Sequence, residues 1–347
     1  MSNSKSFDDY LMSPRYSDIE SRSEVSLETS LGPYTFSLPI ISSPMDTITN
    51  AEMAAAMAEA GGLGIVHRGQ EAAVQAHEVG LGVVIAREKG VKDPIIGAAI
   101  GVKVEDVDRA ERLVDAGAKI LCIDVCHGHH INVKRQIKRL QHLNTTIIAG
   151  NIATRNGAMF LADQGVAGIR VGIGNGSICS TRLNTGHGVP QATALMHAAW
   201  GVSGVMDSTS PPEARPALIS DGGCRNGGDI VKALALGADM VMLGSMLSGT
   251  YETPGNCDDD GYKVYRGMAS EGAQADWGGG VKSVEGVTAK VRSKGAVGPL
   301  LDALAENLRA GLSYSGARTI KDLQACADRI IVSQSSLRES DTHIRFQ

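Results

Sequence analysis

Eight short apolar runs recur along the chain at nearly regular intervals, and this spacing limits its fold more than any other feature. Near-continuous apolar runs indicate strands buried on both faces, and the Ala-rich or amphipathic stretches between them indicate helices that connect parallel strands. Six of the seven intervals are roughly 22 to 33 residues long, as expected for one strand and one helix. The runs are Pro39–Ser43, Gly62–Val66, Ile95–Ala99, Lys119–Asp124, Thr146–Gly150, Gly168–Gly172, Ala217–Asp221 and Asp239–Gly244.

Eight alternating units predict a (β/α)₈ barrel, the TIM barrel architecture, formed by the chain as a single domain. A doubly wound open sheet is the alternative. Helices are legible between the runs at Ala51–Ala60, Val104–Ala116 and Asp229–Leu236. Barrel enzymes carry their chemistry at the C-terminal ends of the strands. Polar or Gly-rich residues occupy those positions here, at Asp124, Gly174–Cys179, Asp221–Cys224 and Gly244–Ser245.

The composition narrows the class of protein further. Of the 347 residues, 43% are hydrophobic and 20% are charged, the balance of a soluble protein with a sizeable core. The net charge of −5 and the absence of a basic run argue against a nucleic-acid partner. Every apolar stretch is too short to span a bilayer, and the polar N-terminus does not resemble a signal peptide. Because the six cysteines suggest no disulfide framework, we expect a cytoplasmic protein.

Two long segments interrupt the regular pattern. The sixth interval contains the Gly-rich stretch 173–191, called the cysteine loop below, at the expected catalytic face of the barrel. A second segment runs from Thr250 to about Gly295 and is expected to be irregular. Its stretch Trp277–Gly280 cannot hold a fixed conformation alone, so we expect residues 269–295 to form a mobile flap.

Glycine and serine at three strand ends predict a phosphate-binding pocket. Gly174, Gly176 and Ser177 form a turn whose N–H groups could face an anion. The pairs Gly222–Gly223 and Gly244–Ser245 repeat this chemistry after the seventh and eighth runs, where barrels often bind phosphate. One such pair would be a weak signal because tight turns need glycine anyway, whereas three together indicate a pocket.

Cys179 lies in the cysteine loop beside Ser177 and Arg182, and its residue type leaves two interpretations open. A free cysteine is usually a small buried hydrophobe, and the other five cysteines fit that description. On a polar loop near a cation, however, a thiolate is favoured and accessible, which makes Cys179 a candidate nucleophile. The stretch Cys126–His130 suggests a metal site, but no matching ligand cluster accompanies it, so we expect polar loop histidines.

The segments Gly172–Arg182 and Gly188–Gln191 resemble the cysteine loop of the IMP dehydrogenase and GMP reductase family. The resemblance covers nearly the whole chain and implies a barrel that binds a purine nucleoside monophosphate and K⁺ as a homotetramer. Only about 25 residues lie between Val66 and Pro94, so the CBS modules that many dehydrogenases insert there are absent. Further matching segments are Phe7–Asp9, Ser43–Thr47, Ala149–Asn151, Ser220–Cys224, Leu243–Ser245 and Tyr265–Met268.

The flap favours the reductase branch of this family. Dehydrogenases carry an Arg-Tyr pair there, and the Arg activates the water that hydrolyses a covalent intermediate. Residues 269–285 contain neither Arg nor Tyr, and Trp277–Val281 resembles the shorter flap of reductases. Against this, the tail Glu339–His343 resembles that of a dehydrogenase, and Asn175 replaces the residue usual in either branch. We expect GMP reductase activity with NADPH, giving IMP and ammonia, with oxidation of IMP by NAD⁺ and water as the alternative.

The resemblance also implies roles for individual residues. Cys179 would add to C2 of the purine, and Thr181 and Glu285 would move the proton that the departing amine requires. This intact set makes a nucleotide-binding protein without catalysis the weaker alternative. Part of the cofactor site would be reached from a neighbouring subunit.

Three sets of binding residues follow from the same resemblance. The implied substrate-binding residues are Ser43, Met45, Ser177, Asp221, Gly222, Gly223, Gly244, Ser245, Tyr265, Gly267, Met268, Ala269 and Gly286. The implied cofactor-binding residues are Ser21, Arg22, Asp124, Val125, Cys126, Ile173, Gly174, Lys282, Tyr314, Ser315, Gly316 and Ala317. The implied K⁺ ligands are the backbone carbonyls of Gly174, Gly176 and Cys179.

Overall fold

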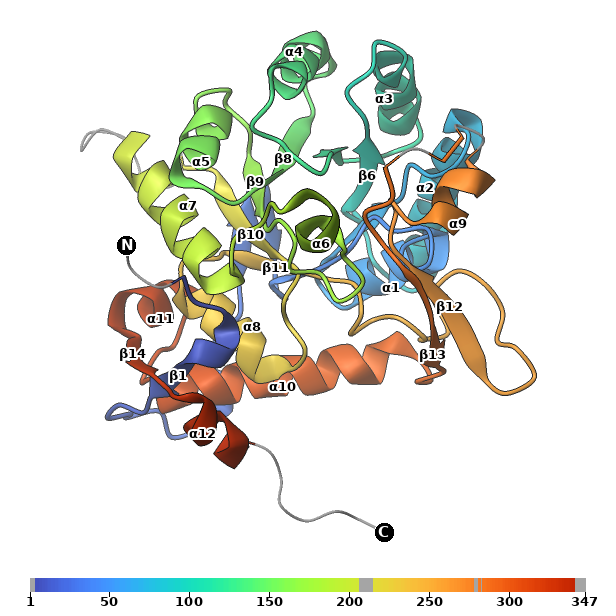
Figure 1. Ribbon diagram of the computed structural model, residues 1–347. Helices are drawn as coiled ribbons and strands as arrows, with labels where there is room; N and C mark the ends of the chain where they lie inside the picture. Colours follow the sequence, from blue (N-terminus) through green and yellow to red (C-terminus); the bar gives the residue numbers. More distant parts are fainter. Residues whose placement is uncertain (1–3, 206–214, 278–279, 282, 341–347) are drawn as a thin grey trace.

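Eight parallel strands close into a barrel in the computed structural model of the protein, which describes residues 4–205, 215–277, 280–281 and 283–340 (Figure 1). The strand order is β10-β11-β4-β5-β6-β7-β8-β9, and pairing of β9 with β10 completes the circle. The barrel strands are β4 (Ile40–Ser42), β5 (Leu63–Val66), β6 (Ile96–Ile100), β7 (Ile120–Asp124), β8 (Thr146–Ile152), β9 (Gly168–Val171), β10 (Ala217–Asp221) and β11 (Met240–Leu243). All eight predicted strands are confirmed, and the open-sheet alternative is wrong.

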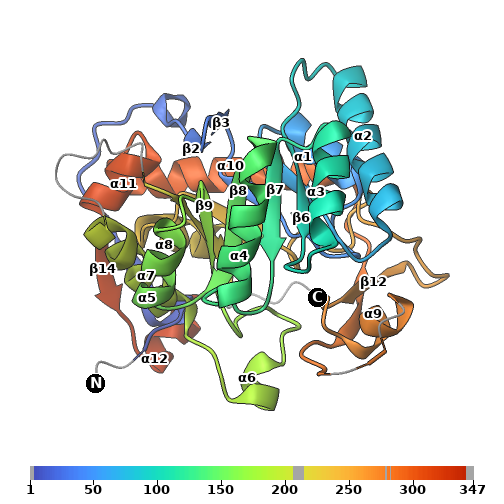
Figure 2. The same ribbon diagram turned by 90° about the horizontal axis from the view of Figure 1, so that it is seen from above.

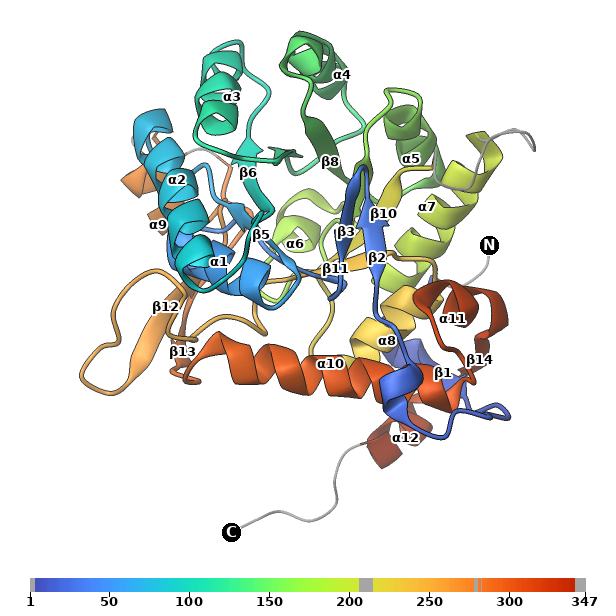
Figure 3. The ribbon, with the colours of Figure 1, turned by 180° about the vertical axis from the view of Figure 1, so that it is seen from behind.

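Helices surround the barrel and connect successive strands (Figures 1 and 3). They are α1 (Ala51–Glu59), α2 (Ala72–Glu88), α3 (Asp106–Asp115), α4 (Ile131–Leu140), α5 (Arg155–Ala162), α7 (Gln191–Val205), α8 (Gly227–Ala235) and α10 (Val297–Tyr314). The three helices expected from the sequence correspond to α1, α3 and α8. Helix α1 begins where the Asn50 side chain accepts a hydrogen bond from the Met53 N–H at 3.1 Å, which satisfies one of its free donors.

A hairpin of β2 (Thr29–Leu31) and β3 (Tyr34–Phe36) lies at the N-terminal end of the barrel (Figure 3). Leu31 and Phe36 pack there with the inward-facing side chains of Ile41 and Ile65. All four side chains are at most 2% exposed, so close packing fills this end of the barrel. The opposite, C-terminal end is therefore where a ligand can enter, as in other TIM barrels.

The ends of the described chain meet on the outside of the barrel, where β1 (Tyr10–Ser13) pairs antiparallel with β14 (Asp328–Ile331). Short elements complete this region and the remaining connections. They are the helices α11 (Ile320–Cys326) and α12 (Gln334–Leu337) and the single turns η1 (Phe7–Asp9), η2 (Arg22–Glu24), η3 (Gln141–Leu143) and η5 (Arg338–Ser340). Among the described residues, the longest helices are still too short or too polar to cross a membrane.

The segment after β11 is ordered into regular elements, so the expectation of an irregular stretch is wrong. β12 (Tyr262–Arg266) and β13 (Thr288–Arg292) form an antiparallel ribbon, and α9 (Glu271–Asp276) lies between them in sequence. The ribbon with α9 and helix α6 (Thr181–Thr185) of the cysteine loop project from the same end of the barrel (Figure 2). The residues that suggested mobility include Gly278 and Gly279, which lie outside the described residues, so mobility of the flap stays a prediction.

A buried lysine explains why strand β12 was not predicted from the sequence. The inward side chains of this strand are Lys263 and Tyr265, each 5% exposed, so the apolar alternation that marks a strand is broken. The Lys263 ammonium donates hydrogen bonds to the carbonyl oxygens of Thr250 and Thr253 at 3.0 and 2.7 Å. Burial lowers the pKa of Lys263, and these carbonyls replace the water that it loses.

Candidate active site

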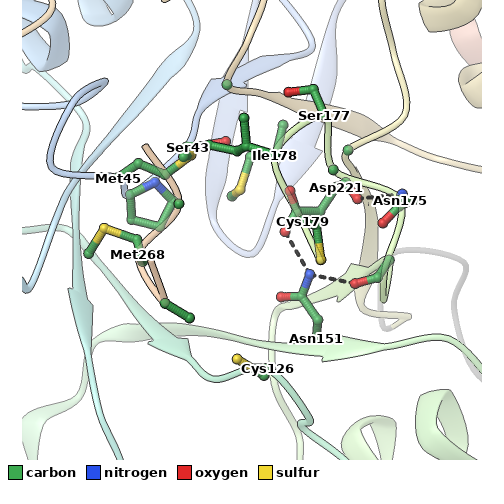
Figure 4. Close-up of a pocket in the computed structure, with 18 of the residues that line it drawn as sticks. Ser43, Met45, Cys126, Asn151, Asn175, Ser177, Ile178, Cys179, Asp221 and Met268 are labelled. Carbon is green, nitrogen blue, oxygen red and sulfur yellow. Dashed lines mark hydrogen bonds between the residues drawn. The ribbon is translucent and has the colours of Figure 1, made fainter. Parts of the chain in front are cut away.

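A cavity of about 300 Å³ opens at the C-terminal end of the barrel, where strand ends, cysteine loop and flap meet (Figure 4). This volume lies at the lower end of the range for small-molecule sites. Cys179, Thr181 and Glu285 line the cavity, as does every predicted substrate-binding residue except Gly286. Five predicted cofactor-binding residues line it as well, namely Asp124, Val125, Cys126, Ile173 and Gly174.

A chain of hydrogen bonds joins the three predicted catalytic side chains. The Cys179 thiol donates to the Thr181 hydroxyl, with 3.2 Å between Sγ and Oγ1. The Thr181 hydroxyl in turn donates to Glu285, with 2.8 Å between Oγ1 and Oε2. A proton on the thiol can therefore reach the carboxylate through one hydroxyl, which is the connection that acid–base chemistry next to a nucleophile requires.

Main-chain pairing brings Glu285 to the cysteine loop from 104 residues further along the chain. The Ser180 N–H donates to the Glu285 carbonyl at 3.0 Å, and the Val287 N–H donates to the Ile178 carbonyl at 3.1 Å. Cys179 and Gly286 form the antiparallel bridge between these two bonds. Gly286 is held in this bridge and does not line the cavity, and the bridge fixes the relative positions of Cys179 and Glu285.

Asp221 ends β10 and presents a carboxylate to the cavity. Its Oδ2 accepts hydrogen bonds from the Asn151 amide at 2.7 Å and from the Arg170 guanidinium at 2.8 Å. Asn151 also donates to the Gly172 carbonyl at 2.8 Å (Figure 4). Both of these side-chain donors reach Oδ2, so Oδ1 remains available to accept further hydrogen bonds.

Arg170 connects this carboxylate to the other side of the cavity. It rises from the middle of β9, is 6% exposed, and also donates to Asp124 at the end of β7. Burial alone would lower its pKa, but the carboxylates of Asp221 and Asp124 raise it well above the ordinary value. Burial would likewise raise the pKa of Asp124, but Arg170 and Arg68 hold it below its ordinary value. The floor of the cavity therefore carries fixed charges.

The glycine-rich strand ends form another part of the cavity wall. Gly222 and Gly223 both have a φ of 86°, a conformation that side chains disfavour, and they turn the chain just after Asp221. The Ser177 and Tyr265 hydroxyls lie 3.2 Å apart, and Ser245 lines the cavity close by. Hydroxyl and backbone N–H donors at the ends of neighbouring strands are the groups that bind phosphate in barrels.

Asn175 locks the start of the cysteine loop onto these glycines. Its amide nitrogen donates to the Asp221 carbonyl at 3.0 Å (Figure 4). A Cβ added to Gly172 or Gly222 would lie 3.1 or 3.2 Å from the Asn175 side-chain atoms. Asn175, which differs from the residue usual in the sequences it resembles, thus occupies space that Gly172 and Gly222 leave open.

The side of the cavity that Met268 lines is built around Asp46, which follows β4. The Asp46 N–H lies 3.2 Å from the Met268 sulfur, and its carboxylate accepts two hydrogen bonds from Arg266, at 2.9 and 2.6 Å. Arg266 also forms an ion pair with Asp276 at the end of α9, with 2.6 Å between Nη1 and Oδ2. This bidentate clamp holds the flap helix against the barrel.

Cys126 follows β7 and places a second thiol in the cavity that Cys179 lines (Figure 4). Desolvation raises the pKa of the Cys126 thiol, and the carboxylates of Asp124 and Glu285 raise it further. The histidines that follow do not build a metal centre: His130 accepts the Asn132 N–H and caps α4. Among the described residues, clusters of three or more His, Cys, Asp or Glu side chains suited to a metal ion are absent.

Backbone oxygens remain as possible ligands for a hard cation such as K⁺. Gly174 shortly precedes a tight turn from Gly176 to Cys179, in which the Cys179 N–H donates to the Gly176 carbonyl at 3.1 Å. A carbonyl oxygen has two lone pairs, so Gly176 retains one for a cation. The donor set fits K⁺ chemically.

Comparison with known proteins identifies the family. The sequence pattern described as "IMP dehydrogenase / GMP reductase domain" matches residues 4–343. The chain belongs to this IMP dehydrogenase and GMP reductase family. Members of the family are oxidoreductases of purine metabolism, and the fold and family predicted from the sequence are both confirmed.

Relatives from both branches of the family match the chain. It is 34% identical to the inosine-5'-monophosphate dehydrogenase of Nitrosopumilus maritimus and 36% identical to that of Cryptosporidium parvum. Both alignments span 97% of this chain, and they span 97% and 94% of those proteins. A GMP reductase of Leishmania donovani is 43% identical over 72% of this chain and 52% of its own length.

A solved structure extends the likeness to three dimensions. A GMP reductase from Trypanosoma brucei, in complex with guanosine 5'-monophosphate, matches with a TM-score of 0.91 at 28% identity. The match covers 100% of this chain and 99% of that one. Because relatives of both branches match at similar identity, sequence identity alone does not separate reductase from dehydrogenase.

Several residues of this family member line the cavity without having been predicted. Arg170 and Asn151 hold Asp221, Arg68 lies beside Asp124, and Trp277 reaches in from the flap. A signal existed for two of them: Arg170 interrupts an apolar strand and Asn151 follows one directly, and a polar group in a buried strand needs a partner. Trp277 was not predicted because the glycines that follow it indicated a stretch without a fixed conformation.

Six of the predicted cofactor residues that the structure describes do not line the cavity of this chain. Lys282 lies outside the described residues. Ser21 and Arg22 lie near the end of α10, where Tyr314 is 64% exposed and Ser315 and Ala317 are buried. Gly316 joins them in a left-handed turn with a φ of 67°. The structure brings these six residues into one region, and their reach into a neighbouring subunit stays a prediction.

Proposed function

We propose that this family member is an NADPH-dependent GMP reductase, which converts GMP, NADPH and a proton to IMP, ammonia and NADP⁺. The observation that carries the proposal is the position of the flap. It delivers Glu285 to Thr181 and Cys179, yet residues 269–285 contain neither of the residue types that dehydrogenases use to activate water.

The arginines that lie nearest to residues 269–285 in sequence support this assignment. Arg266 is held by Asp46 and Asp276 on two sides, so its guanidinium is committed to the clamp. Arg292 pairs with Tyr262 in the ribbon, at the end opposite to Arg266 and Thr288. Neither is placed as a free cation beside Cys179. The match to a GMP reductase structure that contains GMP also supports a purine nucleotide as the ligand.

The charges and hydrogen-bond donors of the cavity suit GMP. We infer that Asp221 Oδ1 accepts the ribose hydroxyls and that the hydroxyls of Ser177, Ser245 and Tyr265 hold the phosphate. Met268 would pack against the base, with Ser43 and Met45 on the same side (Figure 4). In this proposed orientation, C2 of the purine lies towards Cys179, the proposed nucleophile.

The hydrogen-bond chain from Cys179 through Thr181 to Glu285, called the relay below, explains how an amine can leave. As Cys179 Sγ bonds to C2, its proton passes through the Thr181 hydroxyl to Glu285. The same route returns that proton to the exocyclic amine, so the C–N electron pair departs with ammonia. NADPH, when bound beside Asp124, Val125 and Cys126, supplies the hydride that replaces the amine at C2. Cys179 then leaves as a thiolate and takes a proton from solvent.

Exclusion of water decides which product forms. Hydrolysis of the Cys179 adduct would give xanthosine monophosphate instead of IMP. The main-chain bridge between flap and cysteine loop covers the adduct, and the Arg266 clamp keeps the flap helix on the barrel. We further propose a homotetramer whose neighbouring subunit contributes Ser21, Arg22 and residues 314–317, with K⁺ on the carbonyls of Gly174, Gly176 and Cys179.

The decisive experiment compares two substrate pairs in the same absorbance assay for reduced nicotinamide. With GMP and NADPH, we expect continuous loss of NADPH with an equal amount of ammonia. With IMP and NAD⁺, we expect at most a stoichiometric burst of NADH, because the adduct is not hydrolysed. Sustained NADH formation with accumulation of xanthosine monophosphate would assign the protein to the dehydrogenase branch.

A further inference from the structure

Trp277 is an aromatic residue of the flap that lines the active-site cavity and has no part in the chemistry described above. It follows helix α9 directly, and its main-chain N–H donates to the Ala273 carbonyl at 3.2 Å, which continues the helical turn. The side chain is half-buried. An aromatic side chain of this size at the wall of a ligand cavity is a strong candidate for ring recognition.

Helix α9, which precedes Trp277, is anchored at both of its ends. The neighbouring residue, Asp276, is paired with Arg266, and Arg266 is anchored in turn on Asp46 of the barrel. At the other end of α9, the Ser270 hydroxyl accepts the Ala273 N–H at 3.3 Å, and Ser270 is 1% exposed. The position of the indole is therefore fixed by an ion pair at one end of the helix and by the buried Ser270 at the other.

On the barrel side, the indole packs against Gly69. A Cβ at that position would lie 2.4 Å from two indole carbons, so only glycine permits the contact. The Gly69 N–H is held by His67 Nδ1 at 3.2 Å. The adjacent residue, Arg68, donates to the Asp124 carbonyl at 3.1 Å. Trp277 thus flanks the edge of the cavity that Asp124, Val125 and Cys126 form.

We propose that the Trp277 indole stacks on the nicotinamide ring of the dinucleotide and forms the outer wall of its site. This inference rests on the proposed function only in requiring a nicotinamide dinucleotide as the second substrate. The hydride must reach C2 at Cys179, and Trp277 lines the same cavity as Cys179, so the nicotinamide is the ring of the dinucleotide that comes within reach. Its flat, electron-poor ring is cationic when oxidised and complements the electron-rich indole face.

A fluorescence experiment tests the contact without any turnover. Because the chain has only two tryptophans, Trp200→Phe leaves Trp277 as the sole indole. An oxidised nicotinamide does not absorb indole emission, so it quenches only on contact. With GMP bound as a dead-end partner, NADP⁺ should remove most of the emission of the Trp200→Phe protein. The matched Trp277→Phe protein, which keeps only the exposed Trp200, should retain its emission.

Binding constants separate stacking from a general effect on the flap. Trp277→Leu keeps an apolar side chain against Gly69 but removes the ring, and should weaken dinucleotide binding roughly threefold to tenfold. Trp277→Phe should restore most of that affinity, and GMP affinity should stay constant in both variants. Unquenched Trp277, equal dinucleotide binding by the Leu variant, or a parallel loss of GMP affinity would each overturn the proposal. If quenching occurs with NAD⁺ and not with NADP⁺, the stacking proposal stands and the reductase assignment fails.

Discussion

The amide nitrogen of Asn175 donates to the main-chain carbonyl of Asp221 at 3.0 Å, which joins the loop that carries the proposed nucleophile to the strand end that presents the carboxylate proposed to bind the nucleotide. The two elements lie 46 residues apart in sequence. Their connection means that the Cys179 turn cannot shift without straining the Asp221 end of β10. Asn175 acts through Cys179 and Asp221, and is a positioning residue.

The isosteric change Asn175→Asp should lower kcat more than it weakens GMP binding. It removes the only donor in this contact and places an anion beside a carbonyl, and a misplaced nucleophile can cost up to about 10²-fold in rate. Steady-state kinetics and calorimetry with GMP measure the two effects. Asn132→Asp on the exposed start of α4 is the matched control. An unchanged kcat in Asn175→Asp would show that the contact does not position Cys179.

Cys179→Ala should abolish turnover and leave the dissociation constant of GMP within about tenfold, or 1.4 kcal/mol. Phosphate and ribose contacts, rather than the thiol, supply the binding energy for the ground state. The absorbance assay reports the rate, and calorimetry reports the affinity. A variant that kept a tenth of the wild-type rate would remove Cys179 from the mechanism.

The relay can be tested at Thr181 with two substitutions that differ only in the hydroxyl. Thr181→Ser keeps the hydroxyl between Cys179 and Glu285, whereas Thr181→Val keeps the shape and removes it. We expect the valine variant to lose on the order of 10²-fold in kcat and the serine variant to lose far less. Glu285→Gln should resemble Thr181→Val. Equal rates for the serine and valine variants would mean that the proton takes another route.

His67 should make the folded protein sensitive to acid. Burial lowers its pKa from 6.5 to about 4, although the Asp46 carboxylate partly opposes this, and its Nδ1 accepts the Gly69 N–H. Between these two values the unfolded chain binds the extra proton, so the free energy of unfolding should fall as the pH drops from 6.5 to about 4. The loss should be on the order of 3 kcal/mol.

Denaturant titrations at a series of pH values measure this effect. His67→Asn offers a side-chain oxygen to the Gly69 N–H but cannot titrate, so its free energy of unfolding should depend less on pH in that window. The difference between the two slopes isolates His67 from the other titrating groups. Parallel slopes for the two proteins would show that His67 does not become protonated on unfolding.

The sequence predicted the barrel well because its strands are buried on both faces. A short, near-continuous apolar run such as Lys119–Asp124 is typical of a strand buried on both faces. Most intervals between successive runs have the length needed for one connecting helix. The flap ribbon was missed for the opposite reason. Lys263 occupies an inward position, and its ammonium is satisfied by carbonyls from a loop that local sequence cannot place.

The candidate site was predictable to the extent that its residues occur in specific motifs. Cys179 and Thr181 share one loop, whereas Glu285 was linked to them only through the family resemblance. Arg170 was overlooked because its partners, Asp124 and Asp221, end two other strands and meet it only when the barrel closes. Contacts between distant strand ends depend on the barrel geometry and leave no pattern in any single window of sequence.

The second thiol in the cavity changes how cysteine-directed inhibitors would act on this protein. An electrophile that enters the site meets Cys126 as well as Cys179, so the extent of inactivation and the number of alkylated residues need not agree. Nucleotide should shield Cys179, and dinucleotide should shield Cys126. Because Cys126 has a raised pKa, a weakly reactive compound held at the dinucleotide side would attach to it slowly and would depend on prior binding for its selectivity.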